Sequence, residues 1–185
     1  MKVLSLLLVF VLLTSGCNKQ NDAIDKILSV RSRLNESGCE FYTTIVADYG
    51  EYTLTFDLAC CTNERGELMF TVRSPESING ISGVFDAEGG KLRFDDHILA
   101  FSPLSEGLLT PVAAPWVLYS AIKGGYINSG GSVDNGYTIQ IDDTYRDASL
   151  LVDITTDKNG IPCAAELYWE GCRIIWMQID KFQIL

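Results

Sequence analysis

The most reactive side chains in this sequence belong to its six cysteines. A thiol can form a disulfide, ligate a metal or act as a nucleophile, depending on its neighbours. No two cysteines have the Cys-x-x-Cys spacing typical of thiol–disulfide enzymes, and the adjacent pair Cys60-Cys61 does not replace it. The cysteines therefore favour structural roles over redox catalysis. Apart from one near the N-terminus, they are Cys39, Cys60, Cys61, Cys163 and Cys172.

Cys39 and Cys60 are predicted to form a disulfide. They lie at the far ends of two alternating segments, and a two-residue turn at Tyr49-Gly50 would place them directly opposite each other. Directly opposed side chains of an antiparallel pair are close enough for a disulfide. A slipped register would make Cys61 the partner instead. In a reducing environment the thiols would stay free and buried.

Groups suited to acid–base catalysis are sparse. His97 is the single histidine, and it adjoins Asp95-Asp96 in a segment typical of a solvated turn. The carboxylates of Asp95-Asp96 and of Asp142-Asp143 suit calcium, but neither pair has the spacing of a known calcium loop. No nucleophile elbow, metalloprotease motif or phosphate-binding glycine loop occurs. The sequence therefore predicts no enzyme activity, no metal and no cofactor.

The N-terminus has the pattern of a secretory signal. Lys2 precedes an apolar run at 3–13, interrupted only by Ser5, that is shorter than the roughly 20 residues needed to cross a bilayer. Thr14-Ser15-Gly16-Cys17 then resembles a bacterial lipobox, in which the cysteine receives a diacylglyceryl group and becomes the first mature residue. Thr14 departs from the leucine most usual there. The alternative is an ordinary cleaved signal with a cysteine nearby.

The lipobox resemblance implies a membrane-anchored lipoprotein on the extracytoplasmic face of the cell membrane. Residues 1–16 would be the signal peptide, 17–22 a lipidated tether and 23–185 a single domain. Acyl chains such as palmitate on Cys17 would hold the chain at the membrane. The formal net charge is −10, and it becomes −11 (−10 less the single charge of Lys2) after cleavage. This acidic balance, without a basic cluster, disfavours nucleic acid as a partner.

Hydrophobic periodicity predicts one helix followed by a long series of strands. Residues 23–34 place five residues at helical spacing, which are Ile24, Ile27, Leu28, Arg31 and Leu34. From Cys39 the period changes to two, and turn residues such as Glu88-Gly89-Gly90 separate the segments. This pattern predicts an antiparallel meander. Its strands are expected within 39–47, 52–58, 68–73, 81–85, 91–94, 98–101, 137–141, 150–155, 162–169 and 172–182.

Residues 107–125 interrupt the strand pattern. Pro115 suits the first turn of a helix and Gly124-Gly125 suit its end, so a short helix is expected between them with Trp116 and Tyr119 facing inward. The predicted fold class is α+β, with an antiparallel sheet, an N-terminal helix and an inserted helical segment.

The order of these elements resembles the LolA-like superfamily of bacterial lipoproteins and lipoprotein localisation factors. The resemblance rests on the strand–turn–strand at 151–162, the closing hairpin through 169–172, the segments at 70–75 and 91–94, and the helical insertion at 111–123. It implies a strongly curved sheet, an incomplete barrel, with both helical segments on the concave face. It further implies an apolar cavity for acyl chains, or a docking surface for a regulatory partner. A lipidated chain departs from the soluble carriers of the group, because it cannot leave the membrane.

A cavity between sheet and helices would be lined by the apolar residues that strand parity and the inserted helix turn inward. We therefore expect the chain to bind a lipid or another hydrophobic ligand there. The alternative is a regulatory or interaction module in which the outer face or an edge of the sheet binds a membrane protein partner. The apolar outer face of the last strand, formed by Ile175, Met177 and Ile179, would suit such contact if it is uncovered. The cavity candidates are Leu54, Phe56, Phe70, Phe85, Phe94, Phe101, Trp116, Tyr119, Ile139, Leu167 and Trp176.

Overall fold

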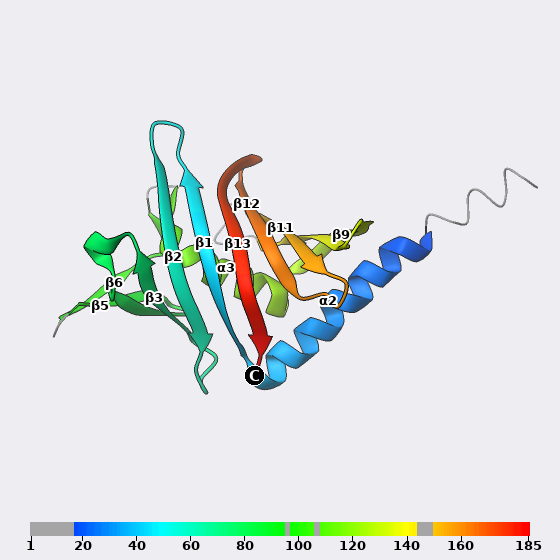
Figure 1. Cartoon of the computed structure of the whole chain (residues 1–185), viewed down its shortest axis with the longest axis horizontal. Coiled ribbons are helices and arrows are strands. Elements are labelled where there is room, and N and C mark those ends of the chain that lie inside the picture. Colours follow the sequence, from blue (N-terminus) through cyan, green and yellow to red (C-terminus); the bar gives the residue numbers. More distant parts are fainter. Residues whose placement is uncertain (1–16, 95–96, 106–107, 144–149) are drawn as a thin grey trace, which may run out of the picture.

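The structure, a computed structural model, describes residues 17–94, 97–105, 108–143 and 150–185. In these ranges the chain forms one open antiparallel sheet of 11 strands and two α-helices (Figure 1). The α+β class and the antiparallel sheet predicted from the sequence are confirmed. The helices are α2 (Cys17–Ser37) and α3 (Ala114–Gly124), and two short 3-10 helices are η1 (Glu76–Ile78) and η2 (Pro111–Ala113).

The sheet consists of two meanders. The first contains β1 (Cys39–Asp48), β2 (Thr53–Thr62), β3 (Leu68–Ser74), β4 (Ser82–Asp86), β5 (Gly89–Phe94) and β6 (His97–Phe101). The second contains β9 (Tyr126–Val133), β10 (Gly136–Asp142), β11 (Leu150–Asp157), β12 (Pro162–Trp169) and β13 (Cys172–Ile184). The strands β7 (Leu104–Ser105) and β8 (Leu108–Leu109) form a separate pair.

The two meanders meet at the centre of the sheet, where β1 pairs with β13. This antiparallel pair brings together residues from opposite ends of the domain, such as Ile45 and Met177. It makes the two halves one continuous sheet. The meanders follow the sequence prediction, whereas β9 and the β1–β13 junction were not predicted.

Burial alternates along the strands and defines two faces of the sheet. In β11, Val152 and Ile154 are buried, while Asp153 and Thr155 between them are partly exposed. The buried side chains form a single core with those of α2 and α3. We call this side the helix-covered face and the opposite side the open face.

The parity predicted for β13 was wrong. Leu167 pairs with Ile175 and Tyr168 pairs with Arg173, so the ladder is shifted at Ile174. One extra residue in a strand reverses the face of every later side chain. Ile175, Met177 and Ile179, which the sequence predicted to face outward, are therefore in the core, and Trp176 lies on the open face.

The predicted register of the first hairpin was also wrong. Asp48 pairs with Thr53, and the Tyr49 N–H donates to Tyr52 O at 3.2 Å, so the turn centres on Gly50 and Glu51. Gly50 has φ +83°, which glycine adopts without strain, and its N–H donates to Asp48 Oδ1 at 2.9 Å. The turn therefore lies one residue later than predicted.

Helix α2 is longer than expected. It begins at Cys17 instead of Ala23, so it includes the residues predicted to be a tether. Its buried stripe is Ala23, Ile27, Val30 and Leu34, whereas Leu28, predicted to face inward, is exposed. The stripe packs on β9, β10 and α3. No helix in the described ranges combines the length and the apolar character needed to cross a bilayer.

Helix α3 begins and ends as predicted, with Pro115 in its first turn and Gly125 at its C-cap. Leu118, Tyr119 and Ile122 are buried, whereas Trp116 is only half-buried. The helix contacts β3 and β10, which belong to different halves of the sheet. It therefore packs behind the central strands (Figure 1).

Arg31 of α2 joins the two helices. Its guanidinium donates from Nε to Ile122 O at 2.6 Å and from Nη2 to Gly125 O at 2.8 Å. The same Nη2 lies 3.4 Å from Ala121 O. These carbonyls end α3, where the helix dipole favours a cation and the last carbonyls lack intrahelical partners. Partial burial lowers the pKa of the Arg31 guanidinium from its ordinary value.

We expect Arg31→Met to lower the free energy of unfolding by about 2 kcal/mol, because it removes charge-assisted hydrogen bonds and leaves carbonyls at the end of α3 without a donor. Urea denaturation followed by circular dichroism measures the change. Arg33→Met is the matched control, since Arg33 lies exposed on the same helix. An equal effect of the two substitutions would contradict this role of Arg31.

Candidate functional sites on the open face

The predicted cavity residues differ in burial and in the face of the sheet on which they lie. Phe70, Phe85, Tyr119, Ile139 and Leu167 are buried core residues with exposures of 0 to 3%. Phe56, Phe101 and Trp116 are half-buried, Leu54 is 37% exposed, and Trp176 is on the opposite face. The side chain of Phe94 lies outside the described residues.

Aromatic contacts pack much of this core. The ring centroids of Phe70 and Phe85 are 5.5 Å apart, and those of Phe85 and Phe101 are 5.3 Å apart. Trp116 and Tyr119 of α3 lie at 5.8 Å. Five of the side chains expected to line a ligand cavity therefore pack against one another in two groups. The hollows most suited to a ligand lie on the open face.

The first hollow is an apolar trough across β1 to β6. Two adjoining parts of about 480 and 380 Å³ share Cys61, Met69 and Thr71. Cross-strand pairing explains the arrangement, because Cys61 pairs with Met69 and Met69 pairs with Val84. We define the apolar trough by its open-face apolar residues, which are Tyr42, Ala59, Cys61, Met69, Val84 and Ile98.

Cationic side chains stand at both ends of the apolar trough. Lys181 lies at one end, with its Nζ 5.3 Å from the ring centroid of Tyr42. Lys91 and Arg93 lie at the other end, where Lys91 Nζ is 2.9 Å from Asp86 Oδ2. The Asp86 carboxylate raises the pKa of the Lys91 ammonium. The trough therefore combines an apolar floor with ionic side chains of both signs at its ends, because Glu40 lines the same part as Lys181, and Glu67 lines the same part as Lys91 and Arg93.

Backbone strain occurs at one of these rims. Lys181 has φ +52°, in the left-handed region that side chains other than glycine and asparagine rarely adopt. It sits at an irregularity in the β1–β13 ladder, between the pairs Glu40–Gln183 and Tyr42–Asp180. This bulge places the ammonium over the ring of Tyr42. Strain of this kind is concentrated at functional sites in proteins.

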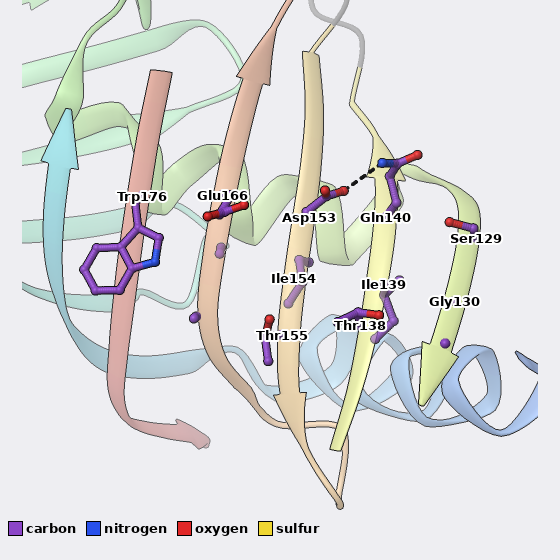
Figure 2. Close-up of a pocket in the computed structure, with 13 residues that line it drawn as sticks. Ser129, Gly130, Thr138, Ile139, Gln140, Asp153, Ile154, Thr155, Glu166 and Trp176 are labelled. Carbon is purple, nitrogen blue, oxygen red and sulfur yellow. Dashed lines mark hydrogen bonds between the residues drawn. The ribbon is translucent and has the colours of Figure 1, made fainter. Parts of the chain in front are cut away.

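The second hollow is a polar groove of about 490 Å³ across β9 to β13 (Figure 2). One wall is a row of residues paired across five neighbouring strands, which we call the polar row. Beside it, the next row has short side chains, and we call it the small row. The polar row is Ser129, Gln140, Asp153, Glu166 and Trp176, and the small row is Gly131, Thr138, Thr155 and Ala164.

Hydrogen bonds hold the polar row in place. Gln140 Nε2 donates to Asp153 Oδ1 at 2.9 Å. The Glu166 carboxylate accepts from the Tyr168 hydroxyl at 2.7 Å and from Arg173 Nη1 at 2.6 Å. The Tyr168 hydrogen bond and then Arg173 hold the pKa of Glu166 below its ordinary value, so this group is a carboxylate at neutral pH.

Two features of the polar groove were not found from the sequence. Strand β9 contains the run Ser129-Gly130-Gly131-Ser132, which is typical of a loop, and it is an edge strand supported by α2. Trp176 was assigned to the wrong face because of the shift at Ile174. The small residues of β9 were the only available signal, since they mark a place where something approaches the backbone.

Within the described residues, His97 and the acidic pair Asp142-Asp143 are not grouped into a metal site. His97 is exposed at the start of β6, and its neighbours 95–96 lie outside the described residues. Asp143 accepts a hydrogen bond from Ser120 Oγ at 3.0 Å, and burial raises the pKa of its carboxyl. Within the described ranges, no three histidine, cysteine or acidic residues are grouped so as to hold a metal ion.

The cysteines of the first hairpin do not face each other. Cys60 pairs with Phe41, and the Cys39 N–H donates to Thr62 Oγ1 at 2.8 Å. Cys39, Cys60 and Cys61 are free thiols in the structure. The register that suggested a Cys39–Cys60 bridge, or a bridge to Cys61, is therefore absent. Burial raises the pKa of Cys39 to about 12, and it also raises the pKa of Cys60.

We expect a maleimide to label Cys172 within minutes in the native protein, because this side chain is exposed. Cys39 and Cys60 should label only after unfolding, since both are buried and little of the reactive thiolate is present at pH 7. Peptide mass spectrometry after labelling in denaturant without reductant checks both sites. Failure of Cys39 and Cys60 to react in denaturant would contradict the free thiols and support a disulfide.

No protein-family model and no curated protein sequence matches the chain. Solved structures that are similar include a LolA superfamily protein from Nitrosomonas europaea, which is 9% identical, covers 85% of this chain and 93% of its own, and has a TM-score of 0.46. A DUF1329 family protein from Desulfovibrio piger is also 9% identical, with coverages of 90% and 93% and a TM-score of 0.48.

The lipoprotein LppX from Mycobacterium tuberculosis is a further similar structure. It is 9% identical, covers 85% of this chain and 94% of its own, and has a TM-score of 0.35. Identities this low transfer no ligand, partner or residue role to this chain.

Proposed function

We propose that this protein is an extracytoplasmic lipoprotein, anchored through Cys17, that binds an acyl chain with an anionic head group in the apolar trough. The observation that carries the proposal is the exposure of apolar side chains along a hollow of the open face. Tyr42, Met69 and Ile98 are 47, 38 and 68% exposed. Contiguous exposed apolar surface of this kind marks sites of binding.

The burial of the predicted cavity residues favours the trough as the ligand site over the cavity predicted from the sequence. Five of the predicted cavity residues are nearly inaccessible, so a ligand between sheet and helices would have to displace a packed core. The trough requires no such change, and each of its two parts lies in the range of volumes typical of ligand sites. We therefore place the hydrophobic ligand on the open face.

The charges at the rims indicate the head group. Lys181 at one end, and Lys91 and Arg93 at the other, suit a carboxylate or phosphate at the end of an acyl chain. Glu40 and Glu67 line the same two parts, and Lys91 is paired with Asp86, so the head group would compete with these carboxylates for the cations. An uncharged or cationic amphiphile would form no ion pair with Lys181, Lys91 or Arg93.

The alternative function is a module that binds a membrane protein partner. The last-strand surface predicted for this contact is not exposed. Ile175, Met177 and Ile179 are 1, 0 and 4% exposed and belong to the core. A partner on the open face over β1 to β6 would cover the trough itself. Binding of a protein there, without acyl binding, is the outcome that would restore this alternative.

The anchor would lie close to the folded domain. Helix α2 begins at Cys17 and has 21 residues, so it is roughly 30 Å long at 1.5 Å per residue. Figure 1 shows the N-terminal end of α2 extending beyond the sheet. An acylated Cys17 would thus place the membrane at the far end of this helix and leave the open face accessible.

We expect Cys17→Ser to abolish incorporation of labelled palmitate and to move the protein from the membrane fraction to the soluble fraction. The reason is that acyl chains supply about 0.8 kcal/mol per buried CH₂. Metabolic labelling followed by fractionation measures both effects, and Cys172→Ser, at an exposed thiol, is the matched control. Continued labelling of the Cys17→Ser chain would contradict the anchor.

We expect Met69→Glu to weaken palmitate binding by about tenfold or more, because a carboxylate in the trough is desolvated and repels the head group. Titration calorimetry of the soluble Cys17→Ser chain with monomeric palmitate gives the dissociation constant. Val133→Glu is the control, since Val133 is an exposed apolar residue of β9 outside the trough. Palmitate binding that Met69→Glu leaves unchanged would place the site elsewhere, and no binding at all would reject the function.

A further inference from the structure

The polar groove is distinct from the apolar trough in both place and chemistry. Its polar row begins at Ser129 on the edge strand and ends at Trp176 beside the centre of the sheet. Each residue of the row is the direct cross-strand partner of the next, so the side chains stand side by side at strand spacing. This alignment presents hydrogen-bonding groups along a line, with an aromatic ring at one end.

The hollow itself results from the small row. Ala164, Thr155 and Thr138 are paired across β12, β11 and β10, and Gly131 follows on β9. Their short side chains rise less from the sheet than those of the polar row, which leaves the space of about 490 Å³. A ligand in this space would rest on the small row and contact the polar row along its side.

The functional groups of the groove match a saccharide. In Figure 2 the indole of Trp176 is seen face-on from the open side, so a flat apolar surface is presented to a ligand. A sugar ring has an apolar C–H face that packs on such a surface, and the negative face of the indole attracts the slightly positive C–H groups. Glu166, Asp153 and Gln140 follow Trp176 along the row and accept or donate hydrogen bonds to hydroxyl groups.

These groups are already held in position. Glu166 is bound by Tyr168 and Arg173, and Gln140 Nε2 uses only one of the acceptor sites of the Asp153 carboxylate. A ligand hydroxyl can therefore bind without first ordering these side chains, which lowers the entropic cost of binding.

Charge restricts the class of sugar. Asp153 and Glu166 are directly opposed on neighbouring strands, which is unfavourable for two carboxylates unless a partner lies between or above them. Arg173 offsets part of the charge at Glu166. The remaining negative charge repels uronic acids and phosphorylated sugars, whereas it tolerates a neutral sugar and attracts an amino sugar. We propose that the polar groove binds a neutral or amino oligosaccharide, with one sugar ring on Trp176.

The test is titration calorimetry of the full-length lipoprotein in zwitterionic detergent, which carries no sugar head group to compete. The probes are the hexamers of N-acetylglucosamine and of glucosamine, with hexagalacturonate as the anionic counterpart. We expect at least one of the first two to bind and hexagalacturonate not to bind. Trp176→Ala and Ala164→Phe should each weaken binding by about tenfold or more, which corresponds to about 1.4 kcal/mol.

Two further variants sharpen the result. Tyr126→Ala removes an exposed aromatic of β9 that does not line the groove, and it should leave binding unchanged. Asp153→Asn should weaken the glucosamine hexamer more than the N-acetylglucosamine hexamer, since it removes the charge but keeps an acceptor. Thermal unfolding verifies that each variant is folded.

The proposal is overturned if neither hexamer binds with a dissociation constant below about 1 mM. That constant corresponds to a binding free energy of only about −4.1 kcal/mol. It is also overturned if binding survives both Trp176→Ala and Ala164→Phe in folded protein, or if hexagalacturonate binds as well as the other two. None of these outcomes depends on the apolar trough, because Met69 and the cations at its rims do not line the groove.

Discussion

The packing of two helices on one face of the sheet is the contact on which the rest of the structure depends. The buried stripe of α2 and the buried side of α3 share a single core with the strands, and Arg31 joins the helices through the last carbonyls of α3. In the described residues these two helices cover only one side of an 11-stranded sheet. The other side therefore stays exposed, and this is where both candidate sites lie.

Irregularities in the strand ladders decide what the open face presents. The shift at Ile174 turns Trp176 outward, and without it this ring would point into the core. The irregularity at Lys181 places its ammonium over Tyr42 at the rim of the trough. Each irregularity interrupts the regular strand pairing and places one side chain at a hollow. These side chains are Trp176 in the polar groove and Lys181 in the apolar trough. The two sites thus owe their end groups to local departures from regular pairing.

The two hollows differ in chemistry although they share one face. The apolar trough lies over the first meander and has cations at its rims, whereas the polar groove lies over the second and is lined by carboxylates, an amide and hydroxyls. They share no lining residue, although β13 contributes Lys181 to the trough and Trp176 to the groove. In the two proposals, an amphiphile and a polar ligand would use separate surfaces of the open face, and neither would require the core to open.

The sequence by itself determined the strand pattern of β1 to β6 and β10 to β13, the position of α3 between Pro115 and Gly125, and the segregation of Phe70 and Ile139 into the core. These are local properties, because periodicity and turn chemistry act over a few residues. Only the tertiary structure decided the face of Trp176, the register of the first hairpin, the strand character of β9 and the near-complete burial of five predicted cavity residues. A bulge, a turn shifted by one residue and support from a distant helix depend on contacts far apart in the chain, which no local pattern encodes.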